Sequence, residues 1–384
     1  MIRFTYLLHG EGPVSGPSAK RSDLAFTKRP GGPVIFWNIT ARCNLACTHC
    51  YLRSGPGRQR EDELTTDEAI ALIDDLVTAD VPLLLFSGGE PLMREDFWDL
   101  IEHTRKCGLP AALSTNGTLI TPRVAQRLRD TGIGYAGISL DGATAATHDA
   151  FRKAPGSFDR SVQALRNCID AGLRCGVRFT VTKKNHNELG DLIALARILG
   201  VHRFCVYWLV PSGRGGDLHM DLQVAPGEVR AVLDLVYREA TRTDPTAMEF
   251  LTVDAPQDGA YLLERLRADA NPAYDQAYRL LTRMGGCSAG KRVANIDPSG
   301  NIYPCQFAQF DEFLVGNIRD RPFSSLWNDP GNRVLAAFRA GESDPGSQCG
   351  ACGWQEVCDM GCRVRAYVQR GDLDGGDPLC LRPG

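Results

Sequence analysis

Three cysteines stand close together in the stretch Cys43-Asn-Leu-Ala-Cys47-Thr-His-Cys50. Thiolates are the usual ligands of iron–sulfur clusters, and a [4Fe–4S] cluster normally takes four of them. A site built from three would leave one iron open for a small chelating ligand. The triplet therefore predicts a reactive iron–sulfur cluster. A zinc site, a disulfide with a spare thiol, and unconnected core cysteines are the alternatives for a short motif of this kind.

A second group of cysteines crowds the last hundred residues. Seven thiols exceed one tetrahedral zinc site and fall one short of two fully ligated clusters. A structural zinc ribbon is the alternative, because paired cysteines at short spacing also suit zinc. The members are Cys287, Cys305, Cys349, Cys352, Cys358, Cys362 and Cys380.

Composition bounds the class of protein. The 384 residues include 43 basic and 46 acidic side chains, a net charge of −3, so no basic footprint predicts a nucleic-acid partner. No apolar run approaches a membrane span, and the first residues lack a signal peptide, so we expect a cytoplasmic protein with no membrane partner. In that reducing compartment fourteen cysteines indicate metal ligation. The four outside both groups fall in apolar periodic segments and are expected to be buried: Cys107, Cys168, Cys175 and Cys205.

Strand-like and helical runs alternate along the middle of the chain. The expected strands are Val34–Thr40, Pro82–Phe86, Ala111–Ser114, Tyr135–Leu140, Val177–Val181 and Arg203–Leu209. Helices are expected from Thr65 and over Phe97–Cys107, Pro122–Thr131, Phe158–Ala171 and Glu188–Leu199. Six such units with nearly continuous apolar strands predict a parallel sheet covered by helices. We expect an α/β fold, a partial (β/α)6 barrel with a small cysteine-rich C-terminal domain.

This pattern also suggests domain boundaries. Residues 1–32 read as a loosely structured lead-in, 33–225 as the barrel, 226–284 as a helical bridge and 285–384 as the cysteine-rich domain.

Polar motifs follow four consecutive strands. The cysteine triplet comes after the first, Ser87-Gly-Gly-Glu90 after the second, Ser114-Thr-Asn116-Gly117 after the third and Ser139-Leu-Asp141-Gly142 after the fourth. Active sites of such folds are built at the carboxyl ends of the strands, so we expect these motifs to share one site. The glycines would allow backbone to approach a ligand closely, and Glu90 could take an ammonium group.

A cysteine pattern C-x3-C-x2-C after a first barrel strand resembles the radical S-adenosylmethionine (radical SAM) enzymes. The resemblance implies a [4Fe–4S] cluster with three cysteine ligands, whose open iron binds SAM and whose electron yields a 5′-deoxyadenosyl radical. It implies that Gly88, Gly89 and Glu90 hold the SAM amino group and that His49 lies near the adenine. Asn116, Ser139 and Arg152 fall where related enzymes contact the ribose and the carboxylate. For Arg152 a surface salt bridge is the alternative.

The cysteine-rich tail resembles the SPASM extension of these enzymes, which carries one or two auxiliary iron–sulfur clusters. By the family pattern Cys349, Cys352, Cys358 and Cys380 would ligate one cluster fully. Cys287, Cys305 and Cys362 would hold a second with an open iron, which could bind substrate or a non-cysteine ligand.

Further stretches resemble the branch of this group that modifies tetrapyrroles, in d-type haem formation and in the sirohaem-dependent haem route. They are Gly32–Asn38, Arg178–Thr180, Ser212–Gly215, Val315–Phe323 with Trp327, Arg363–Ala366 and Gly371–Asp372. The resemblance implies a radical SAM oxidoreductase or lyase that modifies or removes an acetate or propionate side chain of a tetrapyrrole. Arg178 and Arg214 would pair with its carboxylates. A flavodoxin or ferredoxin would donate electrons.

Two other functions remain open. A maturase that modifies a ribosomally made peptide would use the same cysteine set, although the short, Gly/Pro-rich lead-in is a poor peptide-recognition domain. An iron–sulfur scaffold or zinc-bound interaction protein would explain the cysteines but would leave Gly88, Gly89, Glu90 and Asn116 without a role.

Overall fold

A single sheet of eleven strands runs through the part of the protein that the structure describes. The structure is a computed structural model, and it describes residues 1–9, 31–58, 60–340 and 348–381. The order of neighbouring strands is β1-β8-β7-β6-β5-β4-β3-β2-β9-β10-β11. The strands are β1 Ile2–Arg3, β2 Val34–Asn38, β3 Leu84–Ser87, β4 Ala111–Thr115, β5 Ile133–Ser139, β6 Cys175–Val181, β7 Arg203–Trp208, β8 Glu249–Val253, β9 Val293–Ile296, β10 Asn301–Tyr303 and β11 Gly316–Asn317.

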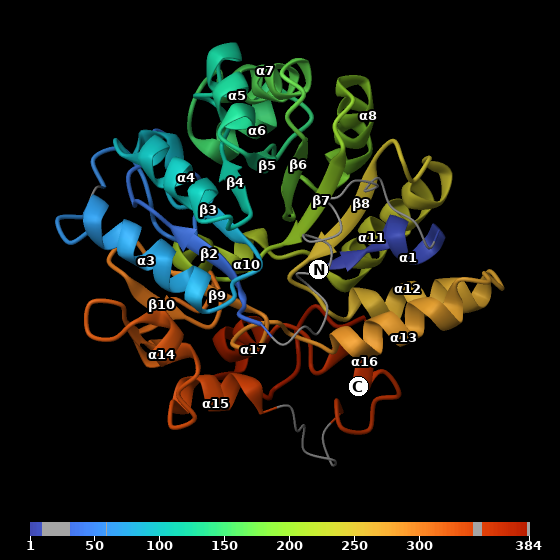
Figure 1. Cartoon of the computed structure of the whole chain (residues 1–384). Helices are drawn as coiled ribbons and strands as arrows, with labels where there is room; N and C mark the ends of the chain where they lie inside the picture. The colour runs from blue at the N-terminus through green and yellow to red at the C-terminus, as the bar shows by residue number, and fades with distance from the viewer. Residues whose placement is uncertain (10–30, 59, 341–347, 382–384) are drawn as a thin grey trace.

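Helices cover the outer side of the curved sheet, and the C-terminal segment lies along the lower side of the picture, beyond β2 (Figure 1). The helices are α1 Phe4–His9, α3 Thr66–Thr78, α4 Phe97–Lys106, α5 Pro122–Asp130, α6 Ala145–Arg152, α7 Ser157–Asp170, α8 Leu189–Leu199, α9 Gly213–Asp217, α10 His219–Leu222, α11 Pro226–Arg242, α12 Asp258–Ala268, α13 Tyr274–Met284, α14 Phe323–Trp327, α15 Arg333–Arg339, α16 Gln355–Cys358 and α17 Arg363–Arg370. Short 3-10 helices span Pro91–Met93, His186–Glu188 and Asp311–Phe313.

The expected partial barrel is confirmed. Strands β2 to β8 pair in parallel in chain order, and their side chains supply much of one continuous buried core. Helix α3 begins with the capping box expected from the sequence: Thr65 accepts from the Glu68 N–H, and Glu68 accepts from the Thr65 N–H at 2.8 Å. Within the described residues no helix combines the length and apolarity needed to cross a bilayer.

The segment expected to be a helical bridge, residues 226–284, contains strand β8 as well as α11, α12 and α13. β8 extends the parallel sheet beyond β7, which makes the barrel one strand longer than the sequence predicts. It begins with the fully buried Glu249, whose carboxylate accepts from Arg3 at 2.5 Å and from Arg203 at 2.7 Å. A carboxylate at the start of an apolar run argues against a buried strand when only the sequence is known. The two arginines that make its burial possible are brought to Glu249 only by the fold.

The first residues of the expected lead-in are also ordered. β1 pairs antiparallel with β8, and α1 buries Phe4, Leu7 and Leu8. Residues 10–30 of that lead-in lie outside the described part.

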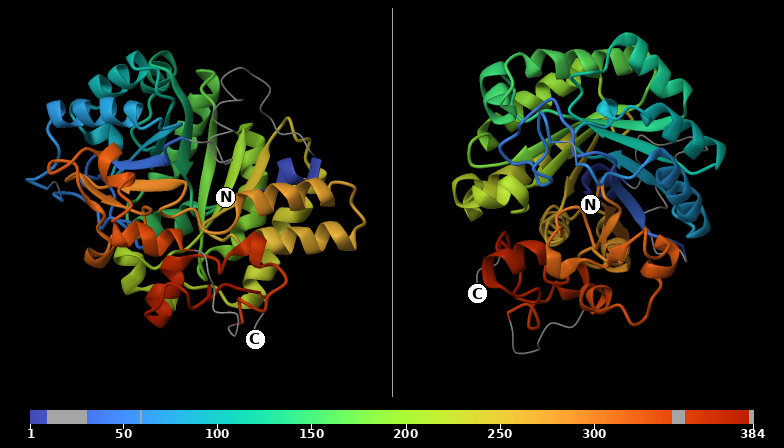
Figure 2. Two further views of the ribbon diagram at one scale, coloured as in Figure 1. Left: turned by 60° about the horizontal axis from the view of Figure 1, so that its bottom comes forward. Right: turned by 90° about the vertical axis from the view of Figure 1, so that its left-hand side faces the viewer.

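The C-terminal segment continues the same sheet. β9 pairs in parallel with β2, and β10 and β11 follow it in antiparallel pairs. In both views of Figure 2 the red C-terminal end of the chain lies below the barrel strands. Helix α14 packs against α3, and α16 packs against α12 and α13. The cysteine-rich segment therefore closes one side of the barrel.

Candidate active site

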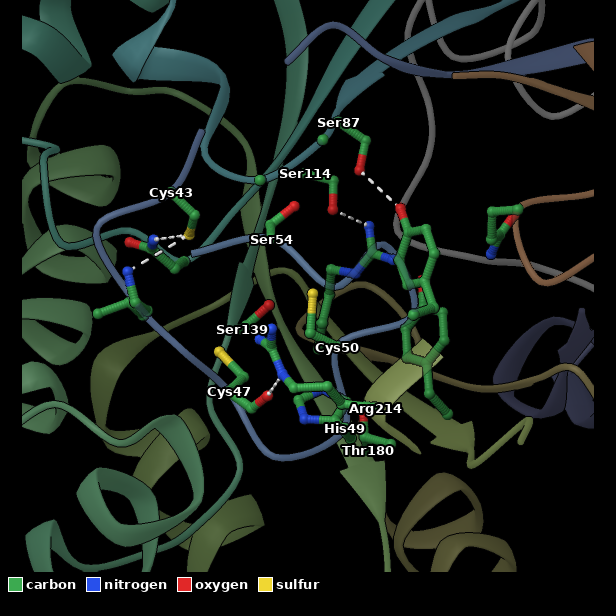
Figure 3. Close-up of a pocket in the computed structure, with 18 of the residues that line it drawn as sticks. Cys43, Cys47, His49, Cys50, Ser54, Ser87, Ser114, Ser139, Thr180 and Arg214 are labelled. Carbon is green, nitrogen blue, oxygen red and sulfur yellow. Dashed lines mark hydrogen bonds between the residues drawn. The ribbon is translucent and has the colours of Figure 1, made fainter. Parts of the chain in front are cut away.

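The carboxyl ends of the parallel strands open onto a cavity of about 1010 Å³, counted with the space at its mouth. Figure 3 shows cysteines, serines and cations from several strand ends facing this space. Eleven of the twelve side chains and glycines that the sequence assigns to SAM, its cluster and the substrate line it. They are Cys43, Cys47, His49, Cys50, Gly88, Gly89, Asn116, Ser139, Arg152, Arg178 and Arg214.

The cysteine triplet occupies the loop after β2. Cys43 and Cys47 are buried and Cys50 is half-buried. Burial, the Glu90 carboxylate and the neighbouring thiols raise the pKa of Cys43 to about 12, and burial also raises the pKa of Cys47. The Cys43 and Cys47 thiols are therefore costly to ionise without a cation nearby, and three cysteines in one loop fit the donor set of a cationic iron–sulfur cluster.

The two glycines after β3 are required by the packing of the chain itself. A Cβ on Gly88 would lie 2.6 Å from the Thr40 carbonyl oxygen, and one on Gly89 would lie 2.2 Å from that of Arg42. The backbone here bonds to the cysteine loop, from the Gly89 N–H to Thr40 at 2.7 Å and from the Glu90 N–H to Arg42 at 2.9 Å. The loops after β2 and β3 thus brace one another at the cavity.

Glu90 is the predicted site residue that does not line the cavity; it lies fully buried behind the wall. Its carboxylate accepts from the Thr115 hydroxyl at 2.8 Å and from the Asn116 N–H at 2.9 Å. Burial raises its pKa to about 7, although these hydrogen bonds act in the opposite direction. Glu90 therefore supplies, beneath the loops after β3 and β4, a negative charge that depends on pH near neutrality.

His49 presents a neutral aromatic plane. Its ring stacks on Phe151 with centroids 4.6 Å apart, and burial lowers its pKa to about 4. Its buried Nδ1 has no hydrogen-bond partner among the described residues. A flat, uncharged ring of this kind suits a position beside a nucleobase.

Arg152 is buried, which excludes the alternative of a surface salt bridge. Its guanidinium pairs with the buried Asp141 and donates to the Cys47 sulfur at 3.5 Å. Although burial opposes the charge, these partners raise the pKa of Arg152 and fix a cation beside the triplet.

Asn116 and Ser139 reach the cavity from β4 and β5. The Asn116 amide donates to Asn44 at 2.9 Å, and its oxygen accepts from the Thr118 hydroxyl at 2.7 Å. Most of the bonding capacity of Asn116 is therefore used inside the protein. Ser139 ends β5 and lines the cavity directly.

Two arginines line the cavity from β6 and from the loop after β7. Arg178 donates to the Ser114 hydroxyl at 2.7 Å, and its guanidinium lies over the Tyr207 ring at 4.5 Å. Arg214 donates through Nε to the Cys47 carbonyl at 2.8 Å, while its buried Nη2 has no hydrogen-bond partner among the described residues. Figure 3 shows Arg214 beside Cys47 and His49. Arg214 thus holds a free donor at the cavity wall.

The sequence analysis missed several residues of the site. Phe307, from the cysteine-rich segment, packs edge-on against Tyr51 of the cysteine loop at 5.4 Å, and both line the cavity. The Tyr207 ring lies under the Arg178 guanidinium. The position of Tyr207 near the end of strand β7 could have indicated in the sequence that it belongs to the site. No local pattern could have placed Phe307 there, because it reaches the cavity only through the pairing of β9 with β2.

Asp254 is a further buried carboxyl that the sequence did not single out. It follows β8 with a left-handed φ of 69°, and its buried Oδ2 has no hydrogen-bond partner among the described residues. Burial raises its pKa to about 6, opposed by Arg365, the amino terminus and Arg178. The signal that could have found it is its position after a barrel strand, but the strand itself was not predicted.

The structure gathers the tail cysteines into two sets. Cys287, Cys305 and Cys362 meet in one apolar cluster, where burial and the other two thiols raise the pKa of Cys305. In the second set burial, Asp377 and three thiols raise the pKa of Cys358. Those three thiols belong to Cys349, Cys352 and Cys380. These are the two sets that the family pattern assigns to separate clusters.

The spacing of the thiols bears on the zinc alternative. A tetrahedral zinc with Zn–S bonds of about 2.3 Å places its sulfur ligands roughly 3.8 Å apart. Any three thiols of either cysteine group in the described residues include a pair of sulfur atoms more than 4.8 Å apart. The thiols of both cysteine groups are thus spread more widely in this structure than the ligands of one tetrahedral zinc.

Two family models match the chain. Residues 37–196 match the radical SAM superfamily, and residues 287–353 match the SPASM iron–sulfur cluster-binding domain. Relatives that are 36% identical align over more than nine-tenths of the chain. The chain belongs to the radical SAM enzymes. Its cofactors are accordingly SAM and iron–sulfur clusters, as the sequence predicts.

Among its relatives are two tetrapyrrole enzymes and one peptide maturase. The chain is 36% identical to Fe-coproporphyrin III synthase of Methanosarcina barkeri, covering 91% of this chain and 87% of that protein. It is 36% identical to pre-heme d1 synthase of Dinoroseobacter shibae, covering 91% and 86%. It is also 35% identical to the mycofactocin maturase MftC of Mycobacterium tuberculosis, covering 91% and 82%.

Solved structures share the fold. SuiB of Streptococcus suis, bound to S-adenosylmethionine, aligns with a TM-score of 0.72 at 18% identity, over 95% of this chain and 81% of that one. At this identity the likeness concerns the partly open barrel and its C-terminal extension.

Proposed function

We propose that this radical SAM enzyme modifies or removes an acetate or propionate side chain of a tetrapyrrole. The observation that carries the proposal is the unpaired Nη2 of Arg214, buried at the wall of the cavity beside the cysteine loop. A buried guanidinium with a free donor is the group that a carboxylate side chain requires. The identity of 36% to two tetrapyrrole enzymes over nine-tenths of the chain supports the same substrate class.

The chain's residues would divide the work as follows. Cys43, Cys47 and Cys50 hold the [4Fe–4S] cluster, and Gly88, Gly89 and Glu90 shape the place of the SAM amino group. His49 lies along the adenine, while Asn116, Ser139 and Arg152 position the ribose and the carboxylate. When bound, SAM and the reduced cluster supply a 5′-deoxyadenosyl radical. Arg178 and Arg214 orient the substrate side chain toward it.

The tail would serve electron transfer. One auxiliary cluster takes Cys349, Cys352, Cys358 and Cys380, and the other takes Cys287, Cys305 and Cys362. An electron donor such as flavodoxin or ferredoxin would act in the cytoplasm.

The test uses anaerobically reconstituted holoenzyme with SAM, a reductant and a panel of sirohaem-type and coproporphyrin-type compounds. We expect one of them to bind, seen as a shift in its absorbance, and to lose or change a carboxylate side chain in the mass spectrum. A wild-type enzyme that cleaves SAM but neither binds nor alters any tetrapyrrole would refute the proposal.

The second candidate function is peptide maturation, favoured by the 35% identity to MftC. The same holoenzyme incubated with a small peptide substrate would then yield a peptide of altered mass. That product, together with no tetrapyrrole binding, would replace the first function by the second.

A further inference from the structure

A second cluster of potential ligands lies on the outer helices, away from the cysteine groups. It consists of Asp74 in the last turns of α3, His103 in the last turn of α4 and Cys107 directly after α4. Their ligand atoms all lie within 4.8 Å of one another, and no other trio of His, Cys or carboxylate side chains in the described residues does so. The sequence analysis expected Cys107 to be a buried core residue; it is half-buried and packs against the edge of the core.

The geometry comes close to that of a mononuclear metal site. His103 Nε2 lies 2.7 Å from Asp74 Oδ1, and the Cys107 sulfur lies 3.5 Å from each of these atoms. Tetrahedral zinc would place a nitrogen and an oxygen roughly 3.4 Å apart and sulfur about 3.6 Å from either. Only the His103–Asp74 contact would have to widen, and the Asp74 side chain is 57% exposed and free to move.

The two helices hold the three side chains in place. His103 and Cys107 are four residues apart and lie on one face of α4, and α3 packs against α4. In a β/α unit the last turn of the helix lies at the amino end of the next strand. The trio therefore sits at the end of the barrel opposite the cavity, where it can touch neither SAM nor substrate.

From this arrangement we propose that Asp74, His103 and Cys107 form a binding site for one zinc-class divalent ion. Thiolate, imidazole and carboxylate together select zinc over magnesium or calcium, which prefer oxygen ligands alone. Three protein ligands leave the fourth position to water. Binding displaces the Cys107 thiol proton, and the ion then ties α3 to α4.

The site also has a structural neighbour. Asp75, next to Asp74, accepts from the Ser324 N–H of α14 at 3.0 Å. A metal that fixes the end of α3 would therefore also steady the contact between the barrel and the cysteine-rich segment.

The experiment uses holoenzyme whose iron–sulfur clusters are fully assembled, so that the other cysteine groups cannot take the added metal. Zinc is added anaerobically, unbound metal is removed, and zinc and iron are counted for the wild type and for His103→Ala and Cys107→Ala. We expect about one zinc per chain in the wild type, its loss in both variants, and unchanged iron content. His186→Ala is the matched control, because His186 faces Glu228 at 3.5 Å in a surface pair that lacks a thiol.

Zinc-edge X-ray absorption identifies the ligands. We expect one sulfur at about 2.3 Å and three lighter atoms at about 2.0–2.2 Å. Bound zinc should also protect Cys107 from alkylation of the native enzyme, read by peptide mapping. No retained zinc, zinc that survives both substitutions, or a shell of three or four sulfurs would overturn the proposal and leave the trio an ion pair beside a thiol.

Discussion

At the scale of single residues, the site contains two buried ionisable groups, Glu90 and Arg152, whose pKa values differ from their ordinary values. Glu90 is fully buried, and its pKa of about 7 leaves it half-protonated near neutral pH. Arg152 keeps its charge beside the triplet because Asp141 and Cys47 pair with it. These two groups would give the SAM site opposite charges for the two ends of the amino-acid moiety.

The first prediction concerns the pH dependence of SAM binding. On the proposed function, the negative charge of ionised Glu90 stabilises the SAM amino group from beneath the loop after β3. The raised pKa of Glu90 means that this charge is lost as the pH falls through about 7. Any titration of the SAM amino group itself is the same in the wild type and in Glu90→Gln, so the difference between the two enzymes reports on the Glu90 carboxylate. We therefore expect the Kd for SAM to rise roughly fivefold from pH 7 to pH 6, measured by calorimetry on the oxidised holoenzyme.

Glu90→Gln should weaken SAM binding and remove this pH dependence. Glu95→Gln is the control, because the Glu95 side chain is 95% exposed. A Glu90→Gln enzyme that kept the wild-type pH profile would show that another group titrates.

The second prediction concerns Arg214. Lysine keeps the charge but loses the planar pair of donors, so Arg214→Lys should lower tetrapyrrole turnover by roughly tenfold or more, which corresponds to about 1.4 kcal/mol. SAM cleavage without substrate should stay near the wild-type rate, and iron content reports whether the lost bond to Cys47 disturbs the cluster. The control is Arg321→Lys, an exposed arginine paired with Asp329 at 3.0 Å and absent from the cavity lining. Equal losses in the two variants would argue against a substrate role.

At the scale of elements, the site is assembled from loops that touch each other through backbone. Gly89 packs against the backbone of the cysteine loop from the β3 side, and Gly213 packs against it from the β7 side. A Cβ on Gly213 would lie 2.2 Å from the Tyr51 carbonyl oxygen. The position of the triplet thus depends on neighbours at two points along the barrel rim.

The third prediction follows from this contact. Gly89→Ala should push the loop after β3 away from Arg42, costing about 1–3 kcal/mol of folding free energy and most of the SAM cleavage activity. Gly227→Ala is the control, since a Cβ there meets no atom within 4 Å. Thermal unfolding and the yield of 5′-deoxyadenosine are the two measurements. A Gly89→Ala enzyme with wild-type values of both would show that the rim tolerates the displacement.

The sequence predicted the barrel elements closely and the outer parts poorly. Helix α5 begins at Pro122 as expected, because proline and the preceding Thr121 mark a helix start in sequence. The helix ends at Asp130, one residue before the expected end. β8 was missed because its first residue, Glu249, is a carboxylate whose partners lie far away in the chain. The strand-end motifs located the cavity, whereas Phe307 could be placed only once the pairing of β9 with β2 was known.

At the scale of the whole molecule, three cysteine sets occupy separate places: the loop after β2, the segment from Cys287 to Cys305 with Cys362, and the segment around α16 with Cys380. The fourth prediction separates their tasks. Replacing Cys43, Cys47 and Cys50 together by alanine should abolish SAM cleavage and lower iron by about four atoms per chain. Retained production of 5′-deoxyadenosine by this triple variant would move the radical chemistry elsewhere.

A matched change in the tail gives the complementary result. Cys352→Ala should remove or destabilise one auxiliary cluster and leave SAM cleavage detectable but uncoupled from product. Zinc in place of iron in the anaerobically purified wild type would contradict this assignment. Iron, sulfide and zinc analysis measures the loss of the cluster, and product analysis measures the uncoupling of SAM cleavage from product.

The pairing of β9 with β2 has a consequence for dissecting the protein. A truncation after residue 284 would turn β2 into an edge strand, and the backbone edge laid bare would belong to an apolar strand that includes Val34, Ile35 and Trp37, all of them buried in the intact chain. Unpaired apolar edges promote intermolecular strand addition. We therefore expect the isolated barrel to be recovered in inclusion bodies, and a functional half-enzyme to be unattainable by simple truncation.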